Sequence, residues 1–225
     1  MTIAAVVGLA LAALVFCLWP GIDLWASAFF FDGSGFPVQT MASVEALRQG
    51  FYAVEDIAGL AAFPLALWAA RRGPVLGQGA RVWAYQGLVF LAGPLLAVNV
   101  LIKPLWSRPR PFRVTDFGGP DLFQPIWQLH GTCPRNCSFT SGEMAGAAAL
   151  SLMAVMLARA NRARLARAYP LALTLALLPL PFTAWQRLAA GRHFLSDEVF
   201  SLLVIGLIAA VLAPMLRTNP ASAKA

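Results

Sequence analysis

Apolar residues along this chain form six long runs that are separated by shorter polar breaks. A helix needs roughly 20 mainly apolar residues to cross a bilayer, and each run has about this length. We therefore predict an all-α polytopic membrane protein with about six transmembrane helices in one bundle. The expected spans are Ile3–Pro20, Phe51–Ala70, Val82–Ile102, Ser138–Ala158, Tyr169–Trp185 and Val199–Met215. Because no internal repeat or separate soluble segment is visible, we expect residues 1–225 to form a single domain.

The composition changes this picture little, but it excludes two classes of protein. Hydrophobic residues make up 59% of the 225 residues and charged residues only 12%, whereas about a quarter of a soluble domain is charged. The formal net charge of +7 would fit a nucleic-acid partner. The basic residues, however, lie in the breaks between apolar runs, where the positive-inside rule places them. We expect the lipid bilayer, and no nucleic acid, as the partner.

The charge of the breaks predicts how the chain crosses the membrane. The breaks Arg71–Arg81 and Arg159–Arg167 hold three and four arginines and no acidic residue, so both should be cytoplasmic. The break Gly21–Gly50 holds three acidic residues and one basic residue, which suits the outer face. Both termini are then cytoplasmic, and Arg217 and Lys224 add positive charge there. The breaks after the first, third and fifth runs all face outward.

The stretch Arg187–Asp197 places titratable side chains between two apolar runs. His193, one of only two histidines, lies six residues after Arg187 and four before Asp197. On a helix this spacing would put His193 and Asp197 on the same face. A carboxylate there orients the imidazole and leaves its other nitrogen free to attack or to accept a proton. The alternative is a solvated helix end whose charges lie among lipid headgroups.

A second cluster, Lys103–Pro111, follows the third run. Its cations Lys103 and Arg110 are seven residues apart on a backbone that three prolines stiffen. Arginine offers a planar fork of donors that suits phosphate, and lysine adds a point charge. The alternative is a basic anchor for headgroups. For the neighbouring Arg108 and Arg113 the open roles are substrate selection and interfacial anchoring, and we expect the second.

A third cluster, Ser138–Glu143, opens the fourth run with small residues. Free backbone N–H groups at such a helix start form an anion site, to which Ser141 and Gly142 would contribute. Ordinary capping of the helix by Thr140 or Ser141, with Glu143 in the first turn, is the alternative.

Together the three clusters contain the groups that phosphoryl transfer requires. Lys103, Arg110 and Arg187 supply positive charge for a phosphate dianion, and Ser141 and Gly142 supply neutral donors. The histidine of the first cluster would be the nucleophile. No second group of acidic residues is placed as a pair of metal sites would require, so we expect no metal ion and no other cofactor.

These residues resemble the motifs of the type 2 phosphatidic acid phosphatase superfamily of integral-membrane lipid phosphatases. The stretch Lys103–Pro111 matches the family's first motif, which is lysine, six residues, arginine and proline. The stretch Arg187–Asp197 matches the third motif in spacing, with Gln186 in place of its serine. The resemblance covers essentially the whole six-span chain. The stretches Gly21–Leu24 and Phe31–Pro37 also look like those of bacterial members, which include lipid A phosphatases.

The resemblance implies a role for each matched residue. His193 would attack the phosphorus to give a phosphohistidine, and Asp197 would orient it. The substrate phosphate would be bound by the three cations Lys103, Arg110 and Arg187, with help from Ser141 and the Gly142 backbone.

The second motif departs from the family pattern of proline, serine, glycine and histidine, because it reads Thr140–Glu143. In the family this histidine protonates the leaving group, so Glu143 would have to serve as the general acid. Three outcomes stay open: an acid that gives a low pH optimum, a diphosphate substrate that needs less protonation, or slow turnover. His130, in the preceding loop, is an alternative acid.

We therefore predict a metal-independent phosphoric ester hydrolase in a bacterial inner membrane, with its active site facing the periplasm. Its substrate would be a phosphomonoester or diphosphate of a phospholipid or lipid A-type glycolipid. The alternatives are a lipid phosphotransferase and a catalytically silent phospholipid-binding membrane protein.

Two cysteines lie four residues apart in the break between the third and fourth runs. An oxidising compartment would favour a local disulfide between Cys133 and Cys137. A zinc site is the weaker alternative, because His130 is the only further ligand nearby, and two cysteines and one histidine fall short of the four ligands of a structural zinc site.

Overall fold

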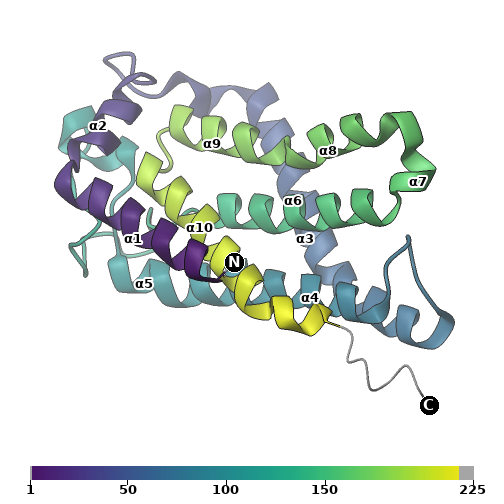
Figure 1. Ribbon diagram of the computed structural model, residues 1–225. Coiled ribbons are helices and arrows are strands. Elements are labelled where there is room, and N and C mark those ends of the chain that lie inside the picture. Colours follow the sequence, from purple (N-terminus) through teal and green to yellow (C-terminus); the bar gives the residue numbers. More distant parts are fainter. Residues whose placement is uncertain (1, 218–225) are drawn as a thin grey trace.

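Helices form nearly all of the regular structure in the computed structural model, which describes residues 2–217 (Figure 1). Within these residues there is no β-strand. The longer helices are α1 (Thr2–Leu18), α3 (Ala42–Arg72), α4 (Ala80–Phe90), α6 (Gly142–Ala160), α8 (Tyr169–Leu177), α9 (Pro179–Ala189) and α10 (Leu195–Leu212). Three shorter helices are α2 (Gly21–Ala28), α5 (Lys103–Trp106) and α7 (Arg162–Leu165).

The segment between α4 and α5 is a π-helical stretch, η2 (Leu91–Ile102). Proline has no N–H to donate and crowds the preceding turn, so Pro94 disturbs regular α-helical bonding here. The carbonyl of Pro94 is satisfied by the Asn99 side chain, whose Nδ2 donates to it at 2.8 Å. The helix therefore continues to Lys103 without a break and delivers this lysine to the site.

Five helical units are long and apolar enough to cross a membrane. They are Ala42–Arg72, Ala80–Arg113, Gly142–Ala160, Arg162–Ala189 and Leu195–Leu216. Helices α1 and α2, which are bent by 83° relative to each other, make a sixth if the pair is one span. This confirms the prediction of an all-α polytopic bundle with about six spans.

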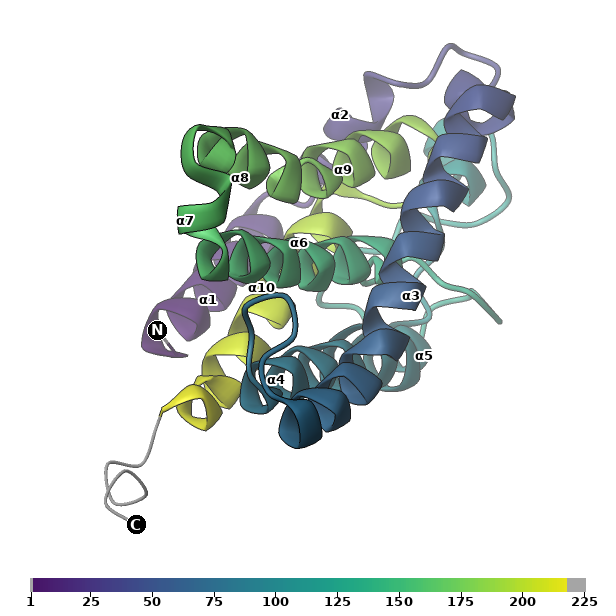
Figure 2. The ribbon, with the colours of Figure 1, turned by 90° about the vertical axis from the view of Figure 1, so that its right-hand side faces the viewer.

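Helix α6 is the centre of the bundle, as Figure 2 shows. It contacts α3, α8, α9, α10 and η2, and 56% of its membrane-length window is buried, against at most 22% for the other four units. Its buried face is built from glycine and alanine, from Ala145 to Ala149. Small residues let neighbouring helices approach closely, which is how helices associate in a bilayer. The outer helices instead expose large apolar side chains such as Leu60 and Leu101.

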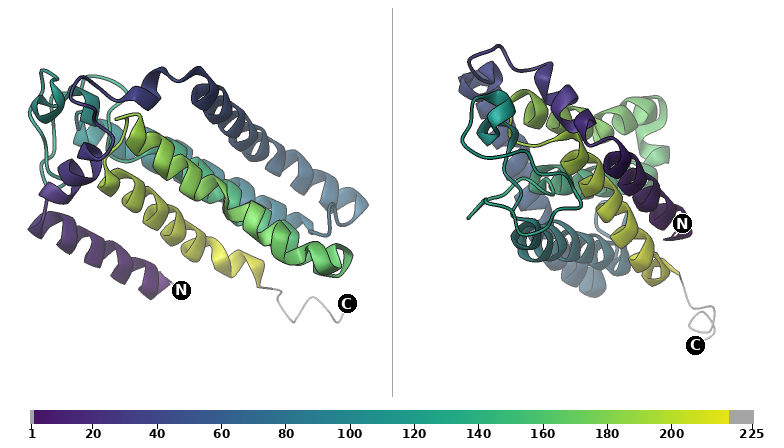
Figure 3. Two further views of the ribbon diagram at one scale, coloured as in Figure 1. Left: turned by 90° about the horizontal axis from the view of Figure 1, so that it is seen from above. Right: turned by 90° about the vertical axis from the view of Figure 1, so that its left-hand side faces the viewer.

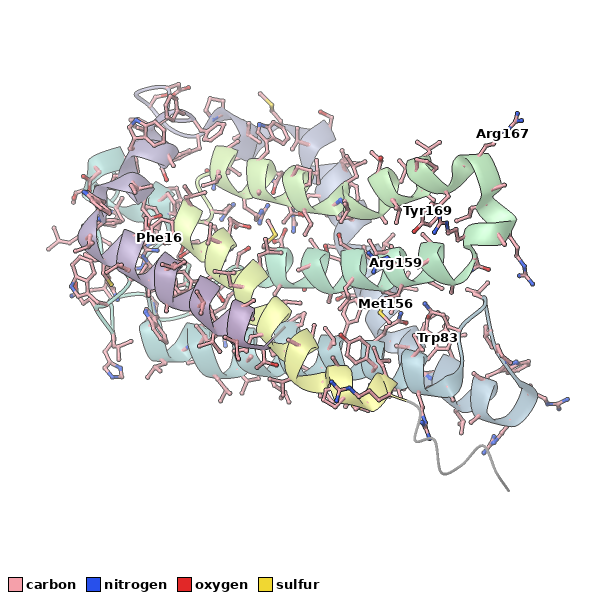
Figure 4. All side chains as sticks on the ribbon, in the orientation of Figure 1. Phe16, Trp83, Met156, Arg159, Arg167 and Tyr169 are labelled. Carbon is pink, nitrogen blue, oxygen red and sulfur yellow. A yellow bond between two sulfur atoms is a disulfide. The ribbon has the colours of Figure 1, made fainter. Side chains whose placement is uncertain are left out.

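The two ends of the bundle differ in chemistry (Figure 3). One end holds α2, α5, the loop 107–141 and the starts of α6 and α10. The other holds the breaks 73–79 and 161–168, and Arg167 lies there (Figure 4). The start of α1 and the end of α10 point in this same direction. Lys224, which we expected to add charge at this end, lies outside the described residues.

Candidate active site

A cavity of about 1020 Å³ opens between α3, η2, the start of α6 and the end of α9. One part of its wall is apolar and includes Leu60, Phe63 and Leu95. The other part is strongly charged, and it is here that predicted site residues come together. The charged and polar lining consists of Gln39, Glu45, Arg48, Tyr52, Glu55, Asp56, Asn99, Lys103, Arg110, Asn136, Glu143, Arg187, Arg192 and His193.

His193 lies in the tight turn that joins α9 to α10. The backbone N–H groups of Arg192 and His193 both donate to the Arg187 carbonyl, at 2.9 and 3.3 Å. The turn requires Gly191 to adopt a φ of +60°, and a Cβ there would lie 2.5 Å from the Phe36 ring. The polar stretch that interrupts two apolar runs therefore folds into a turn that places the imidazole at the cavity wall.

The environment of His193 keeps its imidazole neutral. The side chain is 2% exposed, and this burial lowers the pKa of His193 to about 3, against the opposing effect of the Asp197 carboxylate. Nearby Arg110 and Lys103 lower the pKa further. A neutral imidazole keeps a lone pair available for attack at physiological pH.

Asp197 lies directly behind His193, in the first turn of α10. Its Oδ2 lies 3.4 Å from His193 Nδ1, close enough for an ion pair but without hydrogen-bond geometry. Oδ2 also accepts hydrogen bonds from the Phe194 N–H at 2.8 Å and from the Ser138 hydroxyl. Because Nδ1 faces Asp197, Nε2 is the nitrogen left for a substrate. We predicted that both residues would lie on one helix, four residues apart. Their side chains do face each other, but only Asp197 lies on the helix, because α10 begins after His193.

The three predicted cations Lys103, Arg110 and Arg187 all line the cavity. Arg110 is held by Asn136, whose backbone and side-chain oxygens accept from Nε and Nη2 at 2.9 and 2.8 Å. Arg187 is held by Gln186, the residue in place of the family's serine, which accepts from Nε. Among the described residues no acceptor is bonded to Lys103 Nζ, Arg110 Nη1 or Arg187 Nη2. Each cation therefore keeps a donor for a ligand.

The start of α6 separates the two small residues that we expected to bind phosphate. Gly142 lines the cavity, and a Cβ there would lie 3.3 Å from Lys103 Nζ and 3.1 Å from Asn99 Oδ1. Glycine therefore leaves room for the ammonium group. Ser141 is fully buried, and its Oγ caps the helix by accepting from the Met144 N–H at 3.2 Å. Its hydroxyl does not line the cavity, so the capping alternative describes Ser141 in this structure.

Glu143 is engaged by two arginines. Its Oε1 accepts from Arg187 Nη1 at 2.7 Å and from Arg48 Nη1 at 3.1 Å. Arg48, which comes from α3, is bound in turn by Glu45 at 2.6 Å. Two guanidinium groups therefore occupy Glu143 Oε1. The alternative acid, His130, is exposed and does not line the cavity.

Two charged residues near the site went unrecognised in the sequence. Arg108, which we expected to be an interfacial anchor, is wholly buried and donates to Asp197 Oδ1 at 2.8 Å. That expectation was wrong, because the loop 107–141 folds over this side chain. Asp23, from α2, binds the same guanidinium at 2.8 Å. The likeness of Gly21–Leu24 to lipid A phosphatases was a signal for Asp23, whereas Arg108 was marked only as a charged residue beside an apolar run. Arg113 is exposed and pairs with Asp121 at 2.7 Å, as a surface residue would.

The loop 107–141 contains a disulfide, Cys133–Cys137, with 5.6 Å between the Cα atoms. It closes the segment that presents Asn136 to Arg110. Within residues 2–217 no group of three histidine, cysteine, aspartate or glutamate side chains is arranged to hold a metal ion.

The chain resembles a known family and several known proteins. The model of the PAP2 superfamily matches residues 81–221. A lipid A 4'-phosphatase of Rhizobium leguminosarum is 33% identical over 204 residues, which cover 84% of each chain. A lipid A 4'-phosphatase of Rhizobium etli is 32% identical over 204 residues, 84% of this chain and 77% of that protein. One from Francisella tularensis subsp. novicida is 36% identical over 108 residues, 48% of this chain and 46% of that protein.

No solved structure matches the chain significantly. The superfamily match nevertheless spans the cations of the first motif, the helix start at Gly142 and the turn that carries His193. These are the segments that the fold brings together at the cavity. The chain belongs to the PAP2 superfamily.

Proposed function

We propose that this membrane lipid phosphatase hydrolyses a phosphomonoester of a lipid A-type glycolipid through a phosphohistidine on His193. The observation that carries the proposal is a buried, neutral His193 at the wall of a cavity whose three cations keep free donors. The names of relatives that are 32–36% identical support the substrate class. The apolar part of the cavity wall would accommodate the lipid portion beside the headgroup.

In the proposed first step, Lys103, Arg110 and Arg187 bind the non-bridging oxygens of the phosphate. Nε2 of His193 attacks the phosphorus, and the bond from phosphorus to the sugar oxygen breaks. Positive charge develops on the imidazole as the new bond forms, and the Asp197 carboxylate beside Nδ1 stabilises it. In the second step water attacks the phosphohistidine, releases inorganic phosphate and restores the neutral imidazole.

The leaving sugar oxygen needs a proton, and we propose that Glu143 provides it after Arg187 has left Glu143 to bind the substrate phosphate. A phosphate dianion competes with Glu143 for the Arg187 guanidinium, which contacts the carboxylate at 2.7 Å. Once Arg187 binds the phosphate, Glu143 keeps only its contact with Arg48 at 3.1 Å. It then takes a proton from the open cavity and donates it to the leaving oxygen.

We further propose that residues 1–225 act as a single phosphatase domain in a bacterial inner membrane. The active-site end of the bundle would face the periplasm, and both termini would lie in the cytoplasm. The support is that the arginine-rich breaks gather at the end of the bundle opposite the starts of α6 and α10, and the positive-inside rule places such loops in the cytoplasm. The outer loop would then lie in an oxidising compartment, which suits the disulfide.

The test is phosphate release from lipid A by the purified protein in detergent, without added metal, with product analysis by mass spectrometry. Loss of one phosphate from the lipid is expected. His193→Ala should abolish release, whereas His130→Ala is the matched control, because it removes the other histidine, which is exposed and outside the cavity. Activity that survives His193→Ala would refute the mechanism, and release only from glycerophospholipids would refute the substrate class.

A further inference from the structure

A cluster of buried charges lies behind His193, on the side away from the cavity. Asp23, Arg108 and Asp197 are each at most 1% exposed. The Arg108 guanidinium bridges the two carboxylates, with Nη1 2.8 Å from Asp197 Oδ1 and Nη2 2.8 Å from Asp23 Oδ2. Its Nε donates to the Gln124 carbonyl at 2.7 Å. Neither Asp23 nor Arg108 lines the cavity.

Further contacts close this cluster into a ring. Asp23 accepts from the Ser196 N–H at 2.8 Å and from the Ser196 hydroxyl at 2.6 Å. Ser196 is the neighbour of Asp197 in the first turn of α10. Arg108 also lies against the Phe194 ring, 4.3 Å from its centroid. Asp23 therefore fixes both the guanidinium that holds Asp197 and the helix turn that carries Asp197.

Stability alone gives little reason for this arrangement. Burying charges removes their hydration, and an apolar group of similar shape often serves the folded state as well. Here three charged side chains from α2, the loop 107–141 and α10 are buried together, and one of them, Asp197, lies 3.4 Å from His193. Arg108 occupies Oδ1 of Asp197, so that Oδ2 is the oxygen left to face His193 Nδ1.

We propose that Asp23 and Arg108 are positioning residues for phosphoryl transfer, which hold the Asp197 side chain in place with Oδ2 directed at His193. They act on the nucleophile through Asp197 and do not touch the substrate. Asp23 lies before residue 81, where the match to the superfamily model begins. The N-terminal pair of α1 and α2 is thereby a working part of the active site. This inference rests on the proposed role of His193.

The test compares two variants of the cluster with control variants that remove the same kinds of charge. Asp23→Asn and Arg108→Gln remove the charges of the buried pair. Arg113→Gln and Asp121→Asn do the same to the exposed ion pair of the outer loop, whose arginine side chain is 45% exposed. kcat and KM for lipid A, and the inhibition constant of inorganic phosphate, are measured for each.

The expected result is a split between turnover and binding. In Asp23→Asn and Arg108→Gln kcat should fall on the order of 10- to 100-fold, the range for removing a group that orients a catalytic side chain. KM and the phosphate inhibition constant should stay within about threefold, because neither residue lines the cavity. The double variant should lose little more than Arg108→Gln alone, since both residues act through one contact. The two controls should keep kcat within about twofold.

Several results would overturn the proposal. One is a kcat within threefold of wild type in both variants, and another is an equal loss of kcat and phosphate binding. Because Arg108→Gln leaves two buried carboxylates without a cation, its folding is checked by thermal unfolding beside Arg108→Lys, which keeps the charge but loses the fork. Wild-type kcat in Arg108→Lys, or failure of all three variants to fold, would assign the cluster to stability. Activity in His193→Ala would instead refute the proposed function itself.

Discussion

Replacing Glu143 by glutamine tests the most unusual feature of this site. The substitution keeps the shape of the side chain but removes the charge that Arg187 and Arg48 contact at 2.7 and 3.1 Å. Two consequences follow from the proposed exchange of partners. Phosphate no longer has to displace a carboxylate from Arg187, so it should bind more tightly. The leaving oxygen loses its proton donor, so turnover should fall.

The size of each effect follows from the geometry. The side chains of Arg187 and Glu143 are only 7% and 21% exposed, so their contact is a largely desolvated, charge-assisted hydrogen bond. Such bonds contribute about 1.5–3 kcal/mol. At 1.4 kcal/mol per tenfold, the inhibition constant of inorganic phosphate should decrease by roughly 10- to 150-fold. Loss of a general acid lowers kcat by about 10²- to 10⁴-fold.

The assay is lipid A phosphate release across pH 4–9, with inorganic phosphate as competitive inhibitor. Asp56→Asn is the matched control, because it removes one negative charge from the same cavity without contacting Arg187. Glu143→His should restore turnover and move the pH optimum towards neutral. An unchanged inhibition constant in Glu143→Gln would refute the competition for Arg187. Wild-type kcat at every pH would remove Glu143 from proton transfer.

Three further predictions concern the turn, the nucleophile and the outer loop. In ¹⁵N-histidine NMR of the His130→Asn protein, His193 should stay neutral from pH 5 to 8, because burial lowers its pKa to about 3; a midpoint near 6.5 would contradict this. Gly191→Ala should lower the thermal unfolding midpoint and activity, because φ is +60° and a Cβ would clash, at about 1–3 kcal/mol. Gly206→Ala, which meets no atom within 4 Å, should leave both unchanged or raise stability; equal effects would refute the strain. Mass mapping without reductant should recover the loop disulfide, and two free thiols would rule it out.

The sequence alone determined the spans and most of the residues of the site. Apolar runs of membrane length predict helices independently of how the helices pack, because a backbone in a bilayer must satisfy its own hydrogen bonds. The spacing of the stretches Lys103–Pro111 and Arg187–Asp197 identified three cations, a histidine and a carboxylate. The structure places the cations and the histidine around one cavity, with the carboxylate behind the histidine. The residues of each stretch are close in sequence, so their spacing alone indicates that they can act together.

Only the tertiary structure decided what surrounds those groups. Arg48 reaches Glu143 from 95 residues away, and Asp23 reaches Ser196 across 173 residues. Such contacts depend on how α2, α3, α6 and α10 pack, and no local pattern in the chain encodes them. The same packing buries Arg108 beside Asp197 and turns Ser141 into a helix cap. Sequence spacing specifies which groups share one helix or turn, whereas partners on different helices are chosen by the packing of the whole bundle.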